Sequence, residues 1–171
     1  MATHFNISGE LTKELLAPGD NYRVSKISLT NTQKVSKCKV DLYIEKKLTG
    51  KFYLLKGVEL PIGTTLIYDD IKFSNATGEF GLYIKLTDGA TFTLTGSINP
   101  TGTNTTVPGS GTAFLSELSI GDEILVTGET RIVNAITSDT AATVSAAWGS
   151  DLADDTSPDC NPTALVDVII N

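Results

Sequence analysis

The chain has 171 residues, of which 40% are hydrophobic and 19% charged, a composition that fits one large or two small β domains and excludes a disordered chain. Its formal net charge of −7 is uneven, because residues 1–90 hold twelve basic and ten acidic residues, whereas residues 91–171 hold one basic residue, Arg131, and ten acidic ones. The acidic second half would repel phosphate and the first half has no basic block, so we expect no binding to nucleic acid. The shift in composition predicts two modules.

Neither a membrane span nor a signal peptide is evident. No segment approaches the roughly 20 consecutive apolar residues of a membrane-spanning helix. The first residues, MATHFN, lack the basic start and the apolar run of a signal peptide. We therefore expect a chain that is made in a cytoplasm and does not bind membranes.

Residues 1–21 form the first predicted segment. A short helix is predicted around residues 10–16, and it would end at the turn sequence Ala17–Asp20. An N-terminal arm is the equally good alternative.

Residues 22–95 are predicted to form a β-sandwich module. Apolar side chains recur there with a period of two, and the phase slips at Ser25–Lys26, where we expect a bulge. Turn sequences occur at Pro61–Gly63 and at Asp88–Gly89. Predicted strands cover residues 22–29, 40–45, 52–55, 65–68, 82–86 and 90–95, and the last of these could belong to either module. Five or six strands at this spacing indicate an antiparallel sandwich or barrel.

Residues 96–110 are rich in Gly, Pro, Ser, Thr and Asn and are predicted to be a linker. Residues 111–171 are then a small, acidic, barrel-like β-module. Its clearest element is a hairpin of residues 123–126 and 130–133 around Thr127–Glu129. The last strand, residues 163–170, is apolar and must pair within its own module or with a neighbouring subunit.

The sequence GSGTAFLSELSIGDEI at residues 109–124 resembles a small β-module of structural proteins of tailed bacteriophages, especially contractile-tailed phages of marine cyanobacteria. The resemblance continues at Gly128–Glu129, Arg131–Val133, Ile136, Ser138–Thr140, Val144 and Trp148. Residues 26–66 are similar to a sandwich-like phage segment. Together the two resemblances cover about residues 22–148 and imply a virion protein, without placing it on the head, neck, tail or fibre.

The matched residues also have a structural interpretation of their own. Phe114, Leu118 and Ile120 can form an apolar lid, and Gly121–Asp122 turns the chain into the first strand of the hairpin. Phe114 and Trp148 are predicted to be core residues. None of these positions is expected to do chemistry.

No catalytic, cofactor-binding or metal-binding residue is predicted. His4 is the only histidine and has no evident partner for acid–base catalysis. Cys38 and Cys160 fit no metal spacing; two free structural thiols are the first interpretation, and one long-range disulfide is the alternative. The segment Gly109–Thr112 is a flexible entry to the second module rather than a phosphate-binding loop, because no Lys follows it.

Several acidic residues and glycosylation sequons complete the candidate sites. Asp151, Asp154, Asp155 and Asp159 crowd one loop, where a calcium ion is the alternative to solvated carboxylates. Asp69–Asp70 is interpreted as a strand end. The sequons at Asn6, Asn75 and Asn104 matter only in a secretory pathway, which nothing else indicates.

The expected function is that of a non-enzymatic virion protein, first of all a capsid decoration or cement protein that docks through the less acidic first module. Its expected partners are other virion proteins and further copies of itself. A neck, tail or baseplate accessory protein is the first alternative. A short fibre or adhesin, whose second module binds a host glycan, is the second alternative. A glycan-cleaving enzyme is the third hypothesis, but no motif marks out the pair of carboxylates that it would need.

Overall fold

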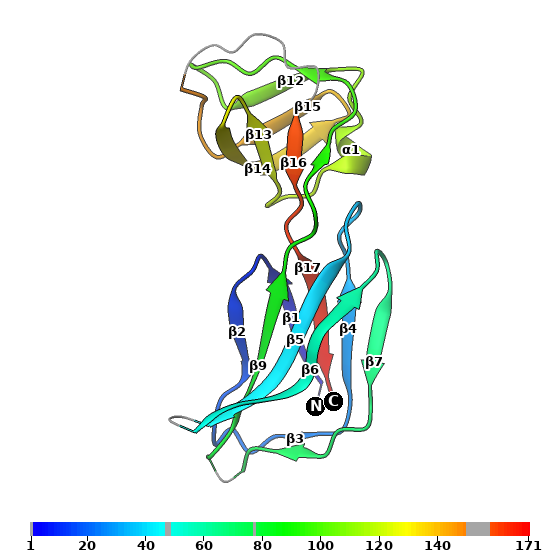
Figure 1. Cartoon of the computed structure of the whole chain (residues 1–171), viewed down its shortest axis with the longest axis vertical. Coiled ribbons are helices and arrows are strands. Elements are labelled where there is room, and N and C mark those ends of the chain that lie inside the picture. Colours follow the sequence, from blue (N-terminus) through cyan, green and yellow to red (C-terminus); the bar gives the residue numbers. More distant parts are fainter. Residues whose placement is uncertain (1, 47–48, 77, 150–157) are drawn as a thin grey trace. The chain divides into compact units, whose positions relative to one another are not determined.

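The computed structural model describes residues 2–46, 49–76, 78–149 and 158–171. In this part of the chain it contains seventeen strands and one short helix, so the predicted all-β class is confirmed. The chain forms two compact units (Figure 1). Unit 1 comprises Met1–Gln33, Lys37–Asp88 and Ala164–Asn171, and unit 2 comprises Lys34–Ser36 and Gly89–Thr163.

Unit 1 is a sandwich of two four-stranded antiparallel sheets, β1-β17-β4-β7 and β2-β9-β5-β6, with a further pair β3-β8. Its strands are β1 (Thr3–Ser8), β2 (Thr12–Leu16), β3 (Arg23–Val24), β4 (Ile27–Asn31), β5 (Cys38–Lys46), β6 (Gly50–Leu60), β7 (Thr65–Tyr68), β8 (Phe73–Ser74), β9 (Gly81–Thr87) and β17 (Leu165–Ile170).

The pairing of these strands is that of a jelly roll. Without β3 and β8, the eight sandwich strands pair first with last, second with seventh, third with sixth and fourth with fifth: β1·β17, β2·β9, β4·β7 and β5·β6. Such a pattern arises when one long antiparallel ribbon folds over on itself into two sheets. The β3·β8 pair continues the ribbon between the two sheets. The pair β17·β4 completes the first sheet, and the pair β5·β9 completes the second.

The core of unit 1 lies between the two sheets and follows the predicted period of two. In β4, for example, Ile27 and Leu29 are fully buried and the residues between them are not. The phase slip at Ser25–Lys26 is not the expected bulge. It is the point at which the chain leaves the β3·β8 pair and enters the first sheet, and the amides of both residues donate to the carbonyl oxygen of Asn171.

Strands β1 (Thr3–Ser8) and β2 (Thr12–Leu16) occupy the N-terminal segment, so the predicted helix around residues 10–16 is wrong, as is the N-terminal arm. Leu15 and Leu16 are neighbours in the sequence and are both buried. A register shift opposite β9, between Glu14 and Leu16, makes this possible in a strand. Pairing with β9 thus outweighs the local helical pattern.

Unit 2 contains one seven-stranded antiparallel sheet, in the order β10-β16-β13-β14-β15-β12-β11. Its elements are β10 (Phe92–Thr93), β11 (Ser97–Ile98), β12 (Thr106–Ser110), α1 (Phe114–Glu117), β13 (Glu123–Val126), β14 (Glu129–Ser138), β15 (Ala141–Val144) and β16 (Asp159–Asn161). The two edge strands, β10 and β11, are joined by residues 94–96 alone, a path that spans at most about 14 Å. The sheet therefore has to curl, and two register shifts within β14 provide bends.

The hairpin of β13 and β14 is confirmed. Thr127 and Gly128 both have positive φ, 50° and 81°, as the two central residues of a type I′ turn require. Phe114, Leu118 and Trp148 are buried, as predicted. Ile120 does not belong to the apolar lid, because its side chain is 64% exposed.

The two units do not follow the predicted boundaries. The expected linker, residues 96–110, contributes β11 and β12 to the sheet of unit 2. The C-terminal strand β17 does not pair within residues 111–171. It lies between β1 and β4 in unit 1, because this position buries Val166, Val168 and Ile170 in the core of the sandwich. Unit 1 therefore holds eleven basic and eleven acidic residues, whereas unit 2 holds two basic and nine acidic residues, a net charge of −7.

Candidate functional site

Both cysteines are free and buried, in agreement with the first interpretation of the sequence. Burial, followed by the charge of Asp88, raises the pKa of Cys38 to about 11. Burial, followed by the charge of Asp122, also raises the pKa of Cys160. Both thiols therefore remain protonated at neutral pH, and a protonated buried thiol is a poor nucleophile.

The remaining sequence candidates do not come together in the structure. His4 lies exposed in β1, opposite Ile169. Gly109 belongs to β12, and the hydroxyl of Thr112 donates to the carbonyl oxygen of Asp139, so the Gly109–Thr112 segment is built into unit 2.

Of the four aspartates considered as calcium ligands, Asp151, Asp154 and Asp155 lie outside the described residues. Asp159 lies in β16 and accepts a hydrogen bond from Thr93. Asp69–Asp70 follows the end of β7, as expected for a strand end. Within the described ranges, no group of three or more His, Cys, Asp or Glu side chains could hold a metal ion.

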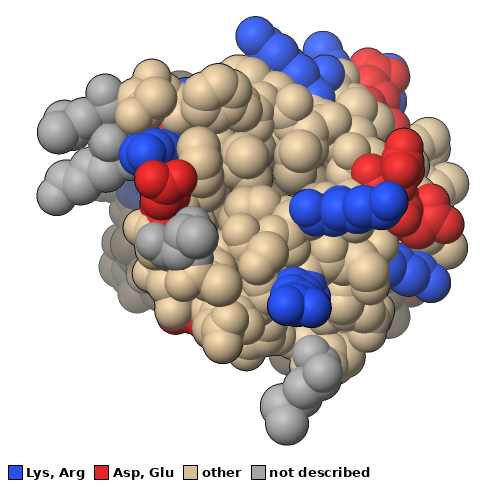
Figure 2. All heavy atoms as spheres, turned by 90° about the horizontal axis from the view of Figure 1, so that it is seen from below, with Lys and Arg blue, Asp and Glu red and all other residues tan. Residues whose placement is uncertain are grey.

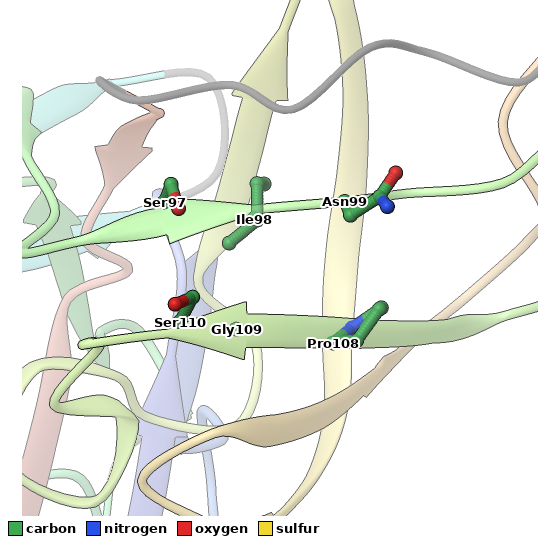
Figure 3. Close-up of a pocket in the computed structure, with 6 residues that line it drawn as sticks. All are labelled: Ser97, Ile98, Asn99, Pro108, Gly109 and Ser110. Atoms are coloured by element: carbon green, nitrogen blue, oxygen red, sulfur yellow. The ribbon is translucent and has the colours of Figure 1, made fainter.

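A shallow pocket of about 270 Å³ lies over the pair of β11 and β12 in unit 2 (Figure 3). It is lined by Ser97, Ile98, Asn99, Pro108, Gly109 and Ser110. These residues provide hydroxyl, amide and backbone groups and no titratable side chain. The pocket can donate and accept hydrogen bonds, but its lining has no acid or base that could activate the hydroxyl of Ser97 or Ser110 as a nucleophile.

The outer face of the sheet β2-β9-β5-β6 carries a row of tyrosines. Strand register places Tyr43 of β5 opposite both Tyr53 of β6 and Tyr83 of β9. The ring of Tyr43 stacks on that of Tyr83 with 5.7 Å between centroids, and it lies 5.5 Å from the ring of Tyr53. Its two neighbours cover Tyr43 so well that it is 1% exposed, although it points away from the core.

Charged groups hold this row in place. The hydroxyl of Tyr83 donates to Glu14 at 2.7 Å, and this hydrogen bond is the main reason that the pKa of Tyr83 rises to about 12. The ammonium of Lys51 donates to the hydroxyl of Tyr43 at 3.2 Å and lies 4.5 Å from the centroid of its ring. The hydrogen bond to Tyr43 also raises the pKa of Lys51.

A pocket of about 340 Å³ lies beside the tyrosine row. It is lined by Thr12, Pro18, Tyr43, Glu45, Lys51 and Tyr83. A Cβ atom at Gly81 would lie 2.8 Å from Cε2 of Tyr83, so a larger residue at position 81 would displace the Tyr83 ring. The sequence shows tyrosines at outward positions of three strands, but only the pairing of those strands reveals that they form one surface.

The second notable surface of unit 1 is the edge strand β6. It has eleven residues and pairs with β5 on one side only. Phe52 and Tyr53 are 50% and 44% exposed. A bulge at Gly57, where φ is +60° and the amide donates to Asp41, interrupts the regular edge. Long edge strands with exposed apolar side chains are surfaces on which another chain can pair.

Charge is scattered on the end of unit 1 that carries β3. Figure 2 shows this face, seen from below, as mostly uncharged, with separate basic and acidic side chains. The visible face has no continuous basic patch of the kind that tracks a phosphate backbone.

No family model, curated protein or solved structure matches the chain. Among the described residues, no helix has the length and apolar character needed to span a membrane.

Proposed function

We propose that this chain is a structural protein of a tailed-bacteriophage particle, most simply a capsid decoration or cement protein, which docks on other virion proteins through unit 1. The resemblance of residues 109–148 to phage β-modules motivates the proposal. The observation that carries the docking role is the eleven-residue edge strand β6 with its exposed Phe52 and Tyr53.

Edge pairing explains how such a surface would bind. A partner strand added beside β6 would gain backbone hydrogen bonds, and the exposed aromatic side chains would add apolar contact area. Unit 1 has no net charge, whereas unit 2 has a net charge of −7. Unit 1 therefore approaches an acidic or neutral shell with less repulsion than unit 2, which would face solvent or a basic partner.

The jelly roll gives a second, weaker line of support. Viral capsid proteins use this fold, but so do lectins and cupins, so the fold alone carries no function. The buried protonated thiols fit a non-enzymatic role. A neck, tail or baseplate accessory protein would use the same edge, and it remains the alternative location on the particle.

Immunogold labelling of purified particles, with an antibody against this chain, tests the proposal. Gold over the head surface is expected, and heads assembled without the chain should then burst more easily. Gold at the neck, tail or fibres would replace the decoration role with the accessory or adhesin alternative. Gold on no particle would overturn the virion proposal.

A binding assay tests the docking surface separately. Particles that lack the chain are mixed with the purified protein and sedimented, and the bound fraction is measured. Phe52→Asp should reduce that fraction strongly. Leu11→Asp is the matched control, because Leu11 is 73% exposed and immediately precedes β2, at the opposite edge of the sheet. Equal binding by both variants would exclude β6 as the docking edge.

A further inference from the structure

The tyrosine row described above has features that a docking edge does not need. Three aromatic side chains face away from the core, on three neighbouring strands, and are held by Glu14 and Lys51. Cross-strand aromatic pairs of this kind stabilise a sheet. The exposed ring of Tyr53 and the partly exposed ring of Tyr83 also offer an aromatic surface to a ligand.

The pocket beside the row combines an aromatic wall with polar groups of both signs. Tyr83 contributes ring surface, Glu45 a carboxylate, Lys51 an ammonium and Thr12 a hydroxyl. Tyr43 is itself 1% exposed and supports the ring of Tyr83 by stacking on it. Its volume of about 340 Å³ falls within the range of about 300–1,000 Å³ that is usual for small-ligand sites. The site is already formed without a ligand, since its rings are stacked and hydrogen-bonded in place.

This combination selects against several ligand classes. A phosphate-bearing ligand would meet Glu45 and, through Tyr83, Glu14. A cationic ligand would meet Lys51. A purely apolar ligand would remove charged groups from water without offering them hydrogen bonds, which is unfavourable.

A neutral sugar ring satisfies all of these groups. One face of a pyranose is made of C–H groups that can lie against an aromatic ring. Its hydroxyls both donate and accept, so they can bond to Glu45, Lys51 and Thr12 together. We propose that the outer face of the sheet β2-β9-β5-β6 is a binding site for a neutral glycan, with Tyr83 as the stacking residue and Glu45 and Lys51 as the polar contacts.

This site lies in unit 1, whereas the adhesin alternative places glycan binding in the second module. It shares β6 with the proposed docking edge, because Lys51 and Tyr53 belong to that strand, but Tyr83 lies on β9, and Phe52→Asp and Tyr83→Ala test the two surfaces by different side chains. The two proposals can therefore fail separately.

The test uses the full chain on an array of immobilised oligosaccharides that includes neutral, sialylated and sulfated members. Binding to neutral members is expected, followed by titration calorimetry with the best of them. Tyr83→Ala should weaken that binding by about two- to tenfold, the effect of losing one aromatic contact. Tyr83→Phe keeps the ring, so its affinity should stay close to that of the parent chain.

Lys51→Met should also weaken binding, because it removes a hydrogen-bond donor to the sugar. Lys39→Met is the matched control: Lys39 is exposed on β5, about 13 Å along the strand from Tyr43. Thermal unfolding of each variant identifies any that has lost its fold. No binding by the intact chain, a preference for the anionic glycans, or equal binding by folded Tyr83→Ala or Lys51→Met would overturn the proposal.

Discussion

Asp88 accepts a hydrogen bond from the backbone amide of Ala164, with 2.6 Å between the carboxylate oxygen and the nitrogen. These two residues are 76 positions apart in the sequence. Asp88 is the last residue of unit 1 before the chain enters unit 2, and Ala164 is the first residue after the chain returns. The hydrogen bond therefore closes the sandwich at the point where unit 2 is inserted between β9 and β17.

We expect the sandwich to fold without the insertion. Because Asp88 and Ala164 are already in contact, a loop of a few Gly and Ser residues can replace 89–163 without straining the ends of β9 and β17. The shortened chain should show a cooperative thermal transition and a β-type circular dichroism spectrum.

A truncation provides the control for that experiment. A chain that ends at residue 163 lacks β17, which pairs with both β1 and β4. It should be unfolded or aggregated, because it leaves the first sheet with an open gap. A stable sandwich in this truncated chain would contradict the jelly-roll pairing.

Removing the Asp88 carboxylate should destabilise unit 1. Asp88→Ala leaves the part-buried amide of Ala164 without this acceptor, at an expected cost of about 1–3 kcal/mol in the free energy of unfolding. Asp88→Asn keeps an oxygen acceptor and should cost less. Denaturant titration of both variants measures the difference. Asp69→Ala, at an exposed position after β7, should change the free energy of unfolding little.

Stability should fall at alkaline pH. Folding raises the pKa of Cys38 from 9.0 to about 11 and that of Tyr83 from 10.0 to about 12. Above pH 9 the unfolded chain therefore loses protons that the folded chain retains, so the free energy of unfolding decreases as the pH rises from about 9 to 12. Urea titrations at pH 7, 9 and 10.5 should show this decrease.

Three variants test which groups cause this pH dependence. Cys38→Ala, Cys160→Ala and Tyr83→Phe should each make it less steep, even where they lower stability overall, because folding raises the pKa of all three side chains. Unchanged slopes would mean that other groups cause the loss. The folded protein should also react slowly with a thiol reagent at pH 8, whereas the denatured chain should yield two thiols per molecule.

Arg131 should be hard to replace by lysine. Its Nε donates to the carbonyl oxygen of Ala147 at 3.0 Å, another nitrogen pairs with Glu129, and the guanidinium lies 5.2 Å from the centroid of the Trp148 ring. Lysine cannot make these contacts at once. We expect Arg131→Lys to destabilise unit 2 by about 1–2 kcal/mol, the cost of one or two lost hydrogen bonds, in denaturant titrations followed by Trp148 fluorescence. Arg23→Lys is the control, since Arg23 is exposed in β3 of unit 1.

Local patterns predicted the strands that pair with near neighbours. The alternation of Val40 and Leu42 and the Thr127–Gly128 turn were enough to locate β5 and the β13·β14 hairpin, because side-chain period and turn geometry depend on a few adjacent residues. The same local reasoning failed at residues 10–16. The spacing of Leu11 and Leu15 fits a helix, and the strand exists because a distant segment, β9, pairs with it.

The candidate site shows the same division. The sequence by itself determined the all-β class, the uneven charge and the interpretation of Cys38 and Cys160 as free thiols, because these depend on composition and short-range pattern. Only the tertiary structure decided that β17 belongs to unit 1 and that Tyr43, Tyr53 and Tyr83 form one surface. Both outcomes depend on which strands pair across long stretches of sequence, and that choice is made by burying the two sheets against each other rather than by any local signal.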